Sequence, residues 1–265
     1  MRHAWNPTRR NKHIGTGAQG HGNDNRLVIP EAWGDIYYEK LDSHKLIVRH
    51  IGLREIRFFI EPARPGFFYP CSIDDISTVL THCPEDALSS FDFIVLRQAT
   101  RKQRILRPVW GRAIFSFDIR RLRGAAIVIE AQNLDSYVWP TSLSTERRRE
   151  LTRLQQDGHA IHRSDRHYRI APNAQSLRNT ILYRTLLHEI GHHVDRQRCS
   201  DEEWDGKTTA TKEDYAHRFA ADLYASLVKQ GIVPFAPFFD EARMEQDGIR
   251  REWFCAPDDF ASQQE

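Results

Sequence analysis

Apolar and polar positions follow two different patterns along this chain of 265 residues. In the first part, short runs of β-branched and aromatic residues are separated by polar or Pro- and Gly-containing turns, which predicts β-strands. The predicted strands are 56–60, 91–96, 109–117, 125–131 and a short one at 167–170. Ser72 is a good cap for a helix over 73–80, and the two aspartates that follow suit its first turn. A polar helix is predicted over 145–156.

From residue 176 onward, apolar residues recur at every fourth position, as on one face of a helix. A long helix is predicted over 176–197, a polar connecting loop over 198–208, and a second helix over 209–230. The two apolar faces consist of Leu182, Leu186, Ile190 and Val194, and of Tyr215, Phe219, Leu223 and Leu227. Strands followed by two long helices predict an α+β fold, in which a mixed, twisted sheet packs on the first helix and the second helix follows.

Three segments differ in composition. Residues 1–26 are rich in Gly, Asn, His and Arg and poor in apolar side chains, which predicts a flexible basic tail. Residues 27–235 contain all the predicted elements and are expected to form one domain. Residues 236–265 are expected to be a C-terminal extension that packs on this domain or is partly disordered.

The overall composition, with 40% hydrophobic and 28% charged residues, is that of a globular protein. No apolar run reaches the roughly 18 residues of a membrane-spanning helix, so no membrane partner is expected. The basic N-terminal residues are not followed by an apolar stretch, which argues against a secretory signal. The four cysteines are far apart and form no CxxC pair, as is typical of free thiols in a reducing compartment. We therefore expect a cytoplasmic protein, with secretion without a cleaved signal peptide as the alternative.

Charge is unevenly distributed, although the net charge is only +2. Positive charge dominates residues 1–173 and negative charge residues 174–265, and the densest basic stretch is Arg97–Arg123. Such a stretch can attract nucleic acid or an acidic peptide, or it can be a solvated surface. Only Trp110 lies near its centre, so the stretch lacks the interleaved aromatic rings of a base-stacking platform. We favour the solvated surface and expect no nucleic-acid partner.

The strongest chemical signal is the sequence HEIGH that begins at His188, an HExxH motif inside the predicted helix 176–197. Residues i and i+4 lie on the same helical face, so His188 and His192 can offer ring nitrogens to one metal ion. Glu189 follows the first of them and is placed to deprotonate a water on that metal. Gly191 removes a side chain beside the metal and lets the backbone of another segment come close.

A catalytic zinc needs a third protein ligand, which comes from a separate segment. Glu213, in the first turns of helix 209–230, is the best candidate. Ala216, Ala220 and Ala221 keep that helix thin, so it can pack closely on the first helix. The weaker alternatives are Asp214, Asp222, Glu202 and Glu203.

Taken together, HEIGHHVD from His188 and the pattern ExxAxxFAA from Glu213 resemble the zincin metallopeptidases whose third ligand is a glutamate. Within that class the chain is similar to the lethal-factor-like peptidases and to small intracellular zincins, over about residues 180–225. The resemblance implies a zincin-like fold and a Zn²⁺ cofactor held by His188, His192 and Glu213. It also implies that Glu189 is the general base.

Two positions depart from the family pattern. His217 stands where such relatives often carry Asp or Asn. Residues 199–212 lack the tyrosine that lethal-factor-like enzymes place before the third ligand. The group that stabilises the oxyanion therefore stays open among Tyr215, His217, His193 and Tyr168.

Further polar residues flank the motif. Asp195 shares a helical face with His192, so it is either an acceptor for a ligand imidazole or a plain carboxylate at the helix surface. His159, His162 and His167 form a histidine-rich stretch before the helix. We interpret them as exposed loop residues rather than as a second metal site.

These residues predict a zinc metalloendopeptidase that hydrolyses a peptide or protein substrate. The substrate is expected to bind as an extended strand along a sheet edge, for which strand 125–131 is the candidate. Two alternatives stay open. One is a zincin-like regulatory or nucleic-acid-binding protein that acts through Arg97–Arg123, and the other is a secreted effector protease with the same chemistry.

Overall fold

The computed structural model describes residues 41, 43–106, 109–119 and 121–257. The predicted tail at 1–26 lies outside the described residues, as do residues 258–265 of the predicted C-terminal extension. Helices and strands are both present in the described part, and the larger sheet is mixed, so the chain has an α+β fold as predicted.

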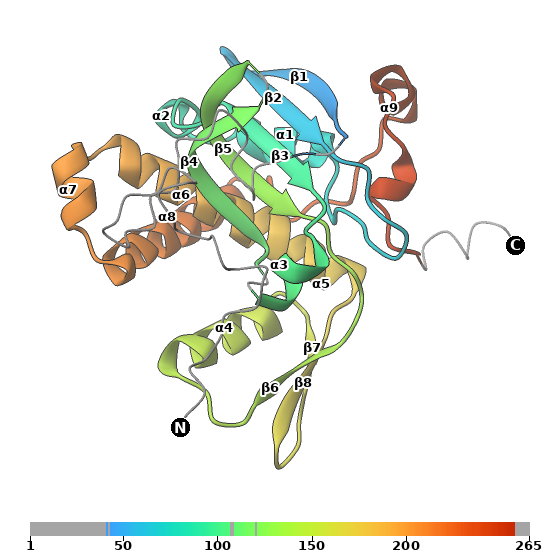
Figure 1. Ribbon diagram of the computed structural model, residues 1–265, viewed down its shortest axis with the longest axis vertical. Coiled ribbons are helices and arrows are strands. Elements are labelled where there is room, and N and C mark those ends of the chain that lie inside the picture. Colours follow the sequence, from blue (N-terminus) through green and yellow to red (C-terminus); the bar gives the residue numbers. More distant parts are fainter. Residues whose placement is uncertain (1–40, 42, 107–108, 120, 258–265) are drawn as a thin grey trace, which may run out of the picture. The chain divides into compact units, whose positions relative to one another are not determined.

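The larger sheet has five strands in the order β1-β2-β3-β5-β4 (Figure 1). They are β1 (Lys45–Ile51), β2 (Arg54–Ile60), β3 (Phe93–Arg97), β4 (Gly111–Ile119) and β5 (Leu122–Glu130). β3 is parallel to both of its neighbours, whereas β1 and β4 pair antiparallel with β2 and β5. The four strands predicted in this region are confirmed. β1 was missed because its exposed positions include Leu46 and Val48, which blur the alternation of polar and apolar side chains.

The prediction that strand 125–131 forms a sheet edge is wrong. β5 lies between β3 and β4, and β4 is the last strand on that side of the described sheet. The burial of the strands gives the reason, because every side chain from Ala126 to Glu130 is buried. A run that is apolar on both faces is typical of an interior strand. β4 has more exposed positions and a bulge between Ile114 and Phe117, which are features of edge strands.

Two hydrophobic clusters cover the two faces of this sheet. The larger one joins sheet residues such as Phe58, Ile94 and Ile127 to the apolar faces of the helices. The smaller one, on the other face, is built around the rings of Phe59, Phe93 and Phe117. The helices of the larger cluster include α1 (Ile73–Thr81), which Ser72 caps as predicted, and the helices that carry the HExxH motif and Glu213.

The predicted helix over 176–197 is confirmed, with an irregular beginning. It starts as α5 (Ala174–Arg178), passes through a π-helical segment (Asn179–Thr185) and continues as α6 (Leu186–Gln197). The predicted apolar face is buried at all four positions, Leu182, Leu186, Ile190 and Val194. The apolar repeat gave no sign of the π-helical segment, because one widened turn leaves the same residues facing the core.

The second predicted helix is α8 (Thr209–Lys229). It ends just before Gly231, whose backbone is in the left-handed conformation. The connection before it is not the predicted loop, because it contains α7 (Asp201–Gly206). Ser200 and Glu203 form a capping box at the start of α7, and acidic residues occupy its first turn. These local contacts stabilise a short helix in a sequence that is polar throughout.

A smaller antiparallel sheet lies beyond the end of the larger one, in the order β6-β8-β7 (Figure 1). Its strands are β6 (Tyr137–Pro140), β7 (Ala160–Arg163) and β8 (His167–Ala171), and α4 (Thr145–Gln156) joins β6 to β7. β8 and α4 match the predictions. β6 and β7 have four residues each, which is too short for a pattern in the sequence to reveal them.

The remaining helices are short. They are α2 (Glu85–Leu88), α3 (Arg101–Leu106), α9 (Glu241–Asp247) and a 3₁₀ turn at Arg251–Trp253. Met244, Trp253 and Phe254 are buried and belong to the larger hydrophobic cluster. None of the four cysteines forms a disulfide bond in the described structure. No helix in the described part of the chain is both long and apolar enough to span a membrane.

Candidate metal centre

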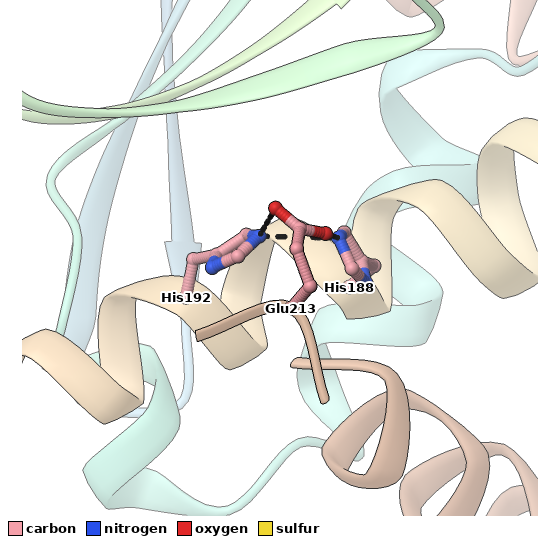
Figure 2. A group of neighbouring side chains, drawn as sticks. All are labelled: His188, His192 and Glu213. Carbon is pink, nitrogen blue, oxygen red and sulfur yellow. Dashed lines mark hydrogen bonds and ion pairs between the residues drawn. The ribbon is translucent and has the colours of Figure 1, made fainter. Parts of the chain in front are cut away.

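His188 and His192 lie one helical turn apart on α6 and point to the same side (Figure 2). Their Nε2 atoms are 3.1 Å apart, and their rings meet edge to face at 4.6 Å between centroids. The i, i+4 spacing of the sequence therefore places the two ring nitrogens side by side.

Glu213 comes from the first part of α8 and reaches between the two histidines (Figure 2). Its Oε2 lies 3.2 Å from Nε2 of His188, and its Oε1 lies 3.5 Å from Nε2 of His192. The other acids considered as third ligand, Asp214, Asp222, Glu202 and Glu203, are exposed and do not join this group. Among the candidates for a third ligand, the structure brings only Glu213 to the histidines.

The two helices can meet here because small residues face each other at their crossing. A Cβ on Gly191 would lie 3.0 Å from Cα of Ala216 and 3.1 Å from its carbonyl oxygen. Three alanines were predicted to let α8 pack closely on the first helix. Ala216 and Ala220 are buried, in agreement with this prediction, whereas Ala221 is exposed. The expectation that Gly191 admits the backbone of another segment is thus confirmed.

The three side chains are close enough to share one metal ion, because one ligand atom from each lies within 4.8 Å of the others. Ligands about 2.0–2.1 Å from a common zinc lie about 3.3–3.4 Å from one another in a tetrahedron. The two ring nitrogens are 3.1 Å apart, and each of the two oxygens of Glu213 faces a different ring nitrogen, at 3.2 and 3.5 Å. Among the described residues, this is the one group of three or more metal-binding side chains close enough to share an ion.

The charges of the three groups are strongly coupled. Hydrogen bonds to His188 and His192 hold the pKa of Glu213 well below its usual range. Burial lowers the pKa of His192, but the hydrogen bond that its ring N–H donates to Glu213 and the charges of the nearby carboxylates outweigh burial, so the net shift is upward. The site therefore favours a positive charge next to an ionised Glu213, which is the role that a bound metal cation would take.

Glu189 is buried where α6 meets the edge strand β4. Its carboxylate accepts a hydrogen bond from the backbone N–H of Ala113 on that strand. Burial raises the pKa of Glu189, Glu213 adds to the rise, and the two histidines oppose it. A raised pKa is what a group needs if it is to exchange a proton near neutral pH.

Gly111 lets β4 approach the helix at this point. A Cβ on Gly111 would lie 2.7 Å from Cγ2 of Thr185 and 3.4 Å from Cγ of Glu189. Any larger side chain would push the strand away from Glu189. Neither Gly111 nor Ala113 was singled out from the sequence, because a glycine and an alanine at the start of a strand carry no signal that they lie beside Glu189.

Of the residues considered for the oxyanion, only His217 lies against the ligands. Its ring centroid is 4.4 Å from that of His188. Burial, followed by the nearby His188 and Arg153, lowers the pKa of His217 to about 4. Its imidazole is therefore neutral near pH 7, and one of its ring nitrogens carries a proton that can be donated.

The other three candidates have different partners. His193 is buried against the sheet and bonds through Nε2 to the carbonyl oxygen of Ala126 at 3.0 Å. The hydroxyl of Tyr215 accepts a hydrogen bond of 2.9 Å from Arg198. Tyr168 belongs to the smaller sheet, where Arg163 packs over its ring.

Asp195 is buried on α6, but its hydrogen bond goes to Lys207 and not to a ligand imidazole. Nζ of Lys207 donates to Oδ1 of Asp195 at 2.6 Å. Lys207 lies in the connection between α7 and α8. The ion pair therefore connects the segment that precedes Glu213 to α6, the helix that carries the HExxH motif. Lys207 was missed in the sequence, because the pairing depends on the turn that α7 makes.

The histidine-rich stretch and the basic stretch are both partly buried. His159 was expected in an exposed loop, but it is buried and its Nε2 lies 2.9 Å from the hydroxyl of Thr180. Arg97 was expected at the solvated surface, but it is buried and paired with Glu130. The cause is the same in both cases, because a polar group enters the interior when a partner satisfies it there.

A polar network links α4 to the π-helical segment just before the motif. Arg184 donates to Glu150 at 2.9 Å and to Asp157 at 2.8 Å, and Asp157 also accepts a hydrogen bond from Thr180. Since Thr180 gives its only proton to Asp157, His159 must be the donor in its bond to Thr180. This network holds α4 against the π-helical segment that leads to His188.

Comparison with known proteins gives no match to a protein-family model, to a curated protein or to a solved structure. The assignment of a function therefore depends on the geometry of the site.

Proposed function

We propose that this chain is a zinc-dependent metallopeptidase with a zincin-like fold. The observation that carries the proposal is the convergence of His188, His192 and Glu213 at the spacing of zinc ligands, next to the buried carboxylate of Glu189. Two imidazoles and a carboxylate are a frequent ligand set of catalytic zinc, and they leave one position open.

In this proposal each residue of the site has a separate role in peptide hydrolysis. His188, His192 and Glu213 would hold the ion, which when bound polarises a carbonyl group and acidifies a water molecule. Glu189 takes a proton from the attacking water and passes it to the leaving amine. The N–H of Ala113 holds the Glu189 carboxylate at the sheet edge, and burial keeps the pKa of that carboxylate raised. His217 is the oxyanion donor in this proposal, because it is neutral and lies beside His188.

The substrate would lie along the outer edge of β4. β4 is the last strand of the described sheet and runs past Glu189 at Gly111 and Ala113. An extended peptide can add to such an edge through main-chain hydrogen bonds. This replaces the edge expected from the sequence, and it brings the peptide bond close to the proposed base. Cysteines without disulfide bonds in the described structure are compatible with action in the cytoplasm.

The test is cleavage of a peptide library by the zinc-loaded parent and by two variants. Glu189→Gln should keep zinc and fold but lose turnover by at least ~10²-fold, as expected for a general base. Glu202→Gln is the matched control, because Glu202 is an exposed acid on α7 outside the site. A parent that binds zinc but cleaves no peptide, or a Glu189→Gln variant with full activity, would contradict the proposal.

A further inference from the structure

A pocket of about 630 Å³ opens beside the proposed catalytic site, between the end of the larger sheet and the smaller sheet with α4. Trp110, at its wall, directly precedes Gly111, the residue at which β4 meets Glu189. From Ala113 to Trp110 the strand covers about 10 Å, at about 3.4 Å for each residue. A peptide on the edge of β4 would therefore place a side chain two or three residues from the cleaved bond at the mouth of this pocket.

Aromatic rings and guanidinium groups line the pocket in stacked pairs. The guanidinium of Arg104 lies over the ring of Phe67 at 4.4 Å, and that of Arg147 over the ring of Trp139 at 5.1 Å. Stacking presents the flat faces of a guanidinium to the rings and leaves its N–H edges free to donate hydrogen bonds. Both guanidinium groups therefore lie over aromatic rings and belong to the lining of the pocket.

The carboxylates at the pocket already have partners. Glu130 is paired with Arg97 at 3.0 Å and with Arg112 at 3.3 Å. Glu150 is paired with Arg184 at 2.9 Å. Asp135 is exposed and accepts a hydrogen bond from the side chain of Asn133.

The two stacked arginines have no such partner. Within the described part of the chain, neither Arg104 nor Arg147 pairs with a carboxylate, and Nε of Arg104 is buried without a hydrogen bond. A buried donor without an acceptor is costly, so the pocket is more favourable with an anion in it. Among the charged side chains that line the pocket, these two cations are the ones without a carboxylate partner in the described structure.

We propose that this pocket binds an acidic side chain, Asp or Glu, of the peptide substrate and thereby selects where the chain is cut. The carboxylate would accept hydrogen bonds from Arg104 and Arg147, while its methylene groups contact the surrounding rings, including Trp110 and Tyr137. This inference rests on the proposed peptidase function for its meaning, but binding in the pocket needs no catalysis and can be measured without it.

The experiment uses zinc-loaded Glu189→Gln protein, in which turnover is suppressed, and fluorescent alanine-rich decapeptides. Each peptide carries one Glu, Gln, Phe or Lys, moved through every position, and its affinity is measured by fluorescence anisotropy. At one position we expect the Glu peptide to bind about tenfold more tightly than the Gln peptide, the size of one charge-assisted hydrogen bond. The same series in the active parent should show cleavage at a fixed distance from Glu.

Two double variants locate the effect. Arg104→Gln with Arg147→Gln should reduce the preference for Glu over Gln to less than about twofold. Arg148→Gln with Arg149→Gln removes the same charge from exposed positions of α4 that do not line the pocket, and it should leave the preference unchanged. Circular dichroism and zinc content show whether each variant is folded.

The outcomes separate the two proposals. If peptides are bound and cleaved with no preference for Glu at any position, or with a preference for Phe that both double variants retain, the acidic-pocket proposal is overturned and the peptidase stands. If Glu peptides bind as expected and the parent cleaves none, the pocket stands and the peptidase falls. If no peptide is bound or cleaved, both are overturned.

Discussion

Gly191 and Ala216 are in direct contact where α6 crosses α8, and a Cβ on Gly191 would lie only 3.0 Å from Cα of Ala216. The contact lies between two of the proposed zinc ligands, because Gly191 precedes His192 and Ala216 follows Glu213 by one helical turn. The closeness of the helices is therefore a condition for the closeness of the ligands.

Gly191→Ala should lower both stability and zinc affinity. Alanine favours a helix over glycine by about 1 kcal/mol, but overpacking against a rigid backbone costs about 1–3 kcal/mol. The clash should win, and Glu213 should move away from the histidines. Urea unfolding and competition with a chromophoric zinc chelator measure the two effects. Gly206→Ala is the matched control, since a Cβ there meets nothing within 4 Å. Equal zinc affinity in both variants would show that the crossing does not set the site.

Substitution of the proposed ligands should reduce zinc binding. The double variant His188→Ala, His192→Ala should lose nearly all zinc, and Glu213→Gln should weaken zinc binding, because each removes ligand atoms of the group. Metal analysis after dialysis against a weak chelator measures both. Asp214→Asn is the control, since Asp214 is the exposed neighbour of Glu213. If Asp214→Asn lost zinc and Glu213→Gln kept it, the third ligand would be wrong.

The sequence predicts the helices of the site well, because the apolar faces are long enough to be periodic. Leu182, Leu186, Ile190 and Val194 fix which side of α6 is buried, and this leaves His188 and His192 on the other side. Glu213 follows from the same logic on α8. The predicted ligand set therefore needs little beyond the helical repeat and the requirement for a third ligand.

What the sequence does not predict depends on contacts between distant segments. The order of the strands decides that β4 and not β5 is the edge, and no local pattern records which strand is last. The N–H of Ala113 reaches Glu189 only because Gly111 lets the strand approach. The pocket needs the smaller sheet, whose short strands carry no periodic signal.

Stability should fall as the pH decreases through the range in which histidines are protonated. His193 is buried, and burial lowers its pKa to about 4, against about 6.5 in the unfolded chain. Between pH 6.5 and 4 the unfolded chain therefore binds a proton at His193 that the folded chain does not bind. The free energy of unfolding decreases as the pH is lowered through this window, and above pH 6.5 His193 does not affect it. The contribution is up to about 3 kcal/mol, at 1.36 kcal/mol for each pKa unit.

His193→Gln removes this titration and keeps an N–H donor for the carbonyl oxygen of Ala126. Urea unfolding at several pH values between 7 and 4 should therefore show a shallower pH dependence for His193→Gln than for the parent. His162→Gln is the control, since His162 is exposed on β7. A parent whose stability is flat from pH 6.5 to 5, or a His193→Gln variant with the slope of the parent, would argue against a neutral buried His193.

Lys207→Met should destabilise the protein and weaken the zinc site from a distance. The side chain of Asp195 is almost fully buried, at 3% exposure, and in the described structure its ion pair is with Lys207. Without that partner a buried carboxylate is left uncompensated, which costs about 1–3 kcal/mol. The connection from α7 to α8 would also lose its tie to α6, so Glu213 should be held less firmly and zinc should dissociate faster.

A double-mutant cycle distinguishes this ion pair from a general loss of packing. Adding Asp195→Asn to Lys207→Met removes the buried charge and should restore part of the stability and of the zinc affinity that Lys207→Met alone loses. Lys229→Met, at the exposed end of α8, is the matched control and should change neither quantity by more than about 0.5 kcal/mol. Urea unfolding and chelator competition are measured on all four proteins. Strictly additive effects of the two substitutions would mean that Lys207 does not act through Asp195, and the tie between the motif helix and α8 would have to be sought elsewhere.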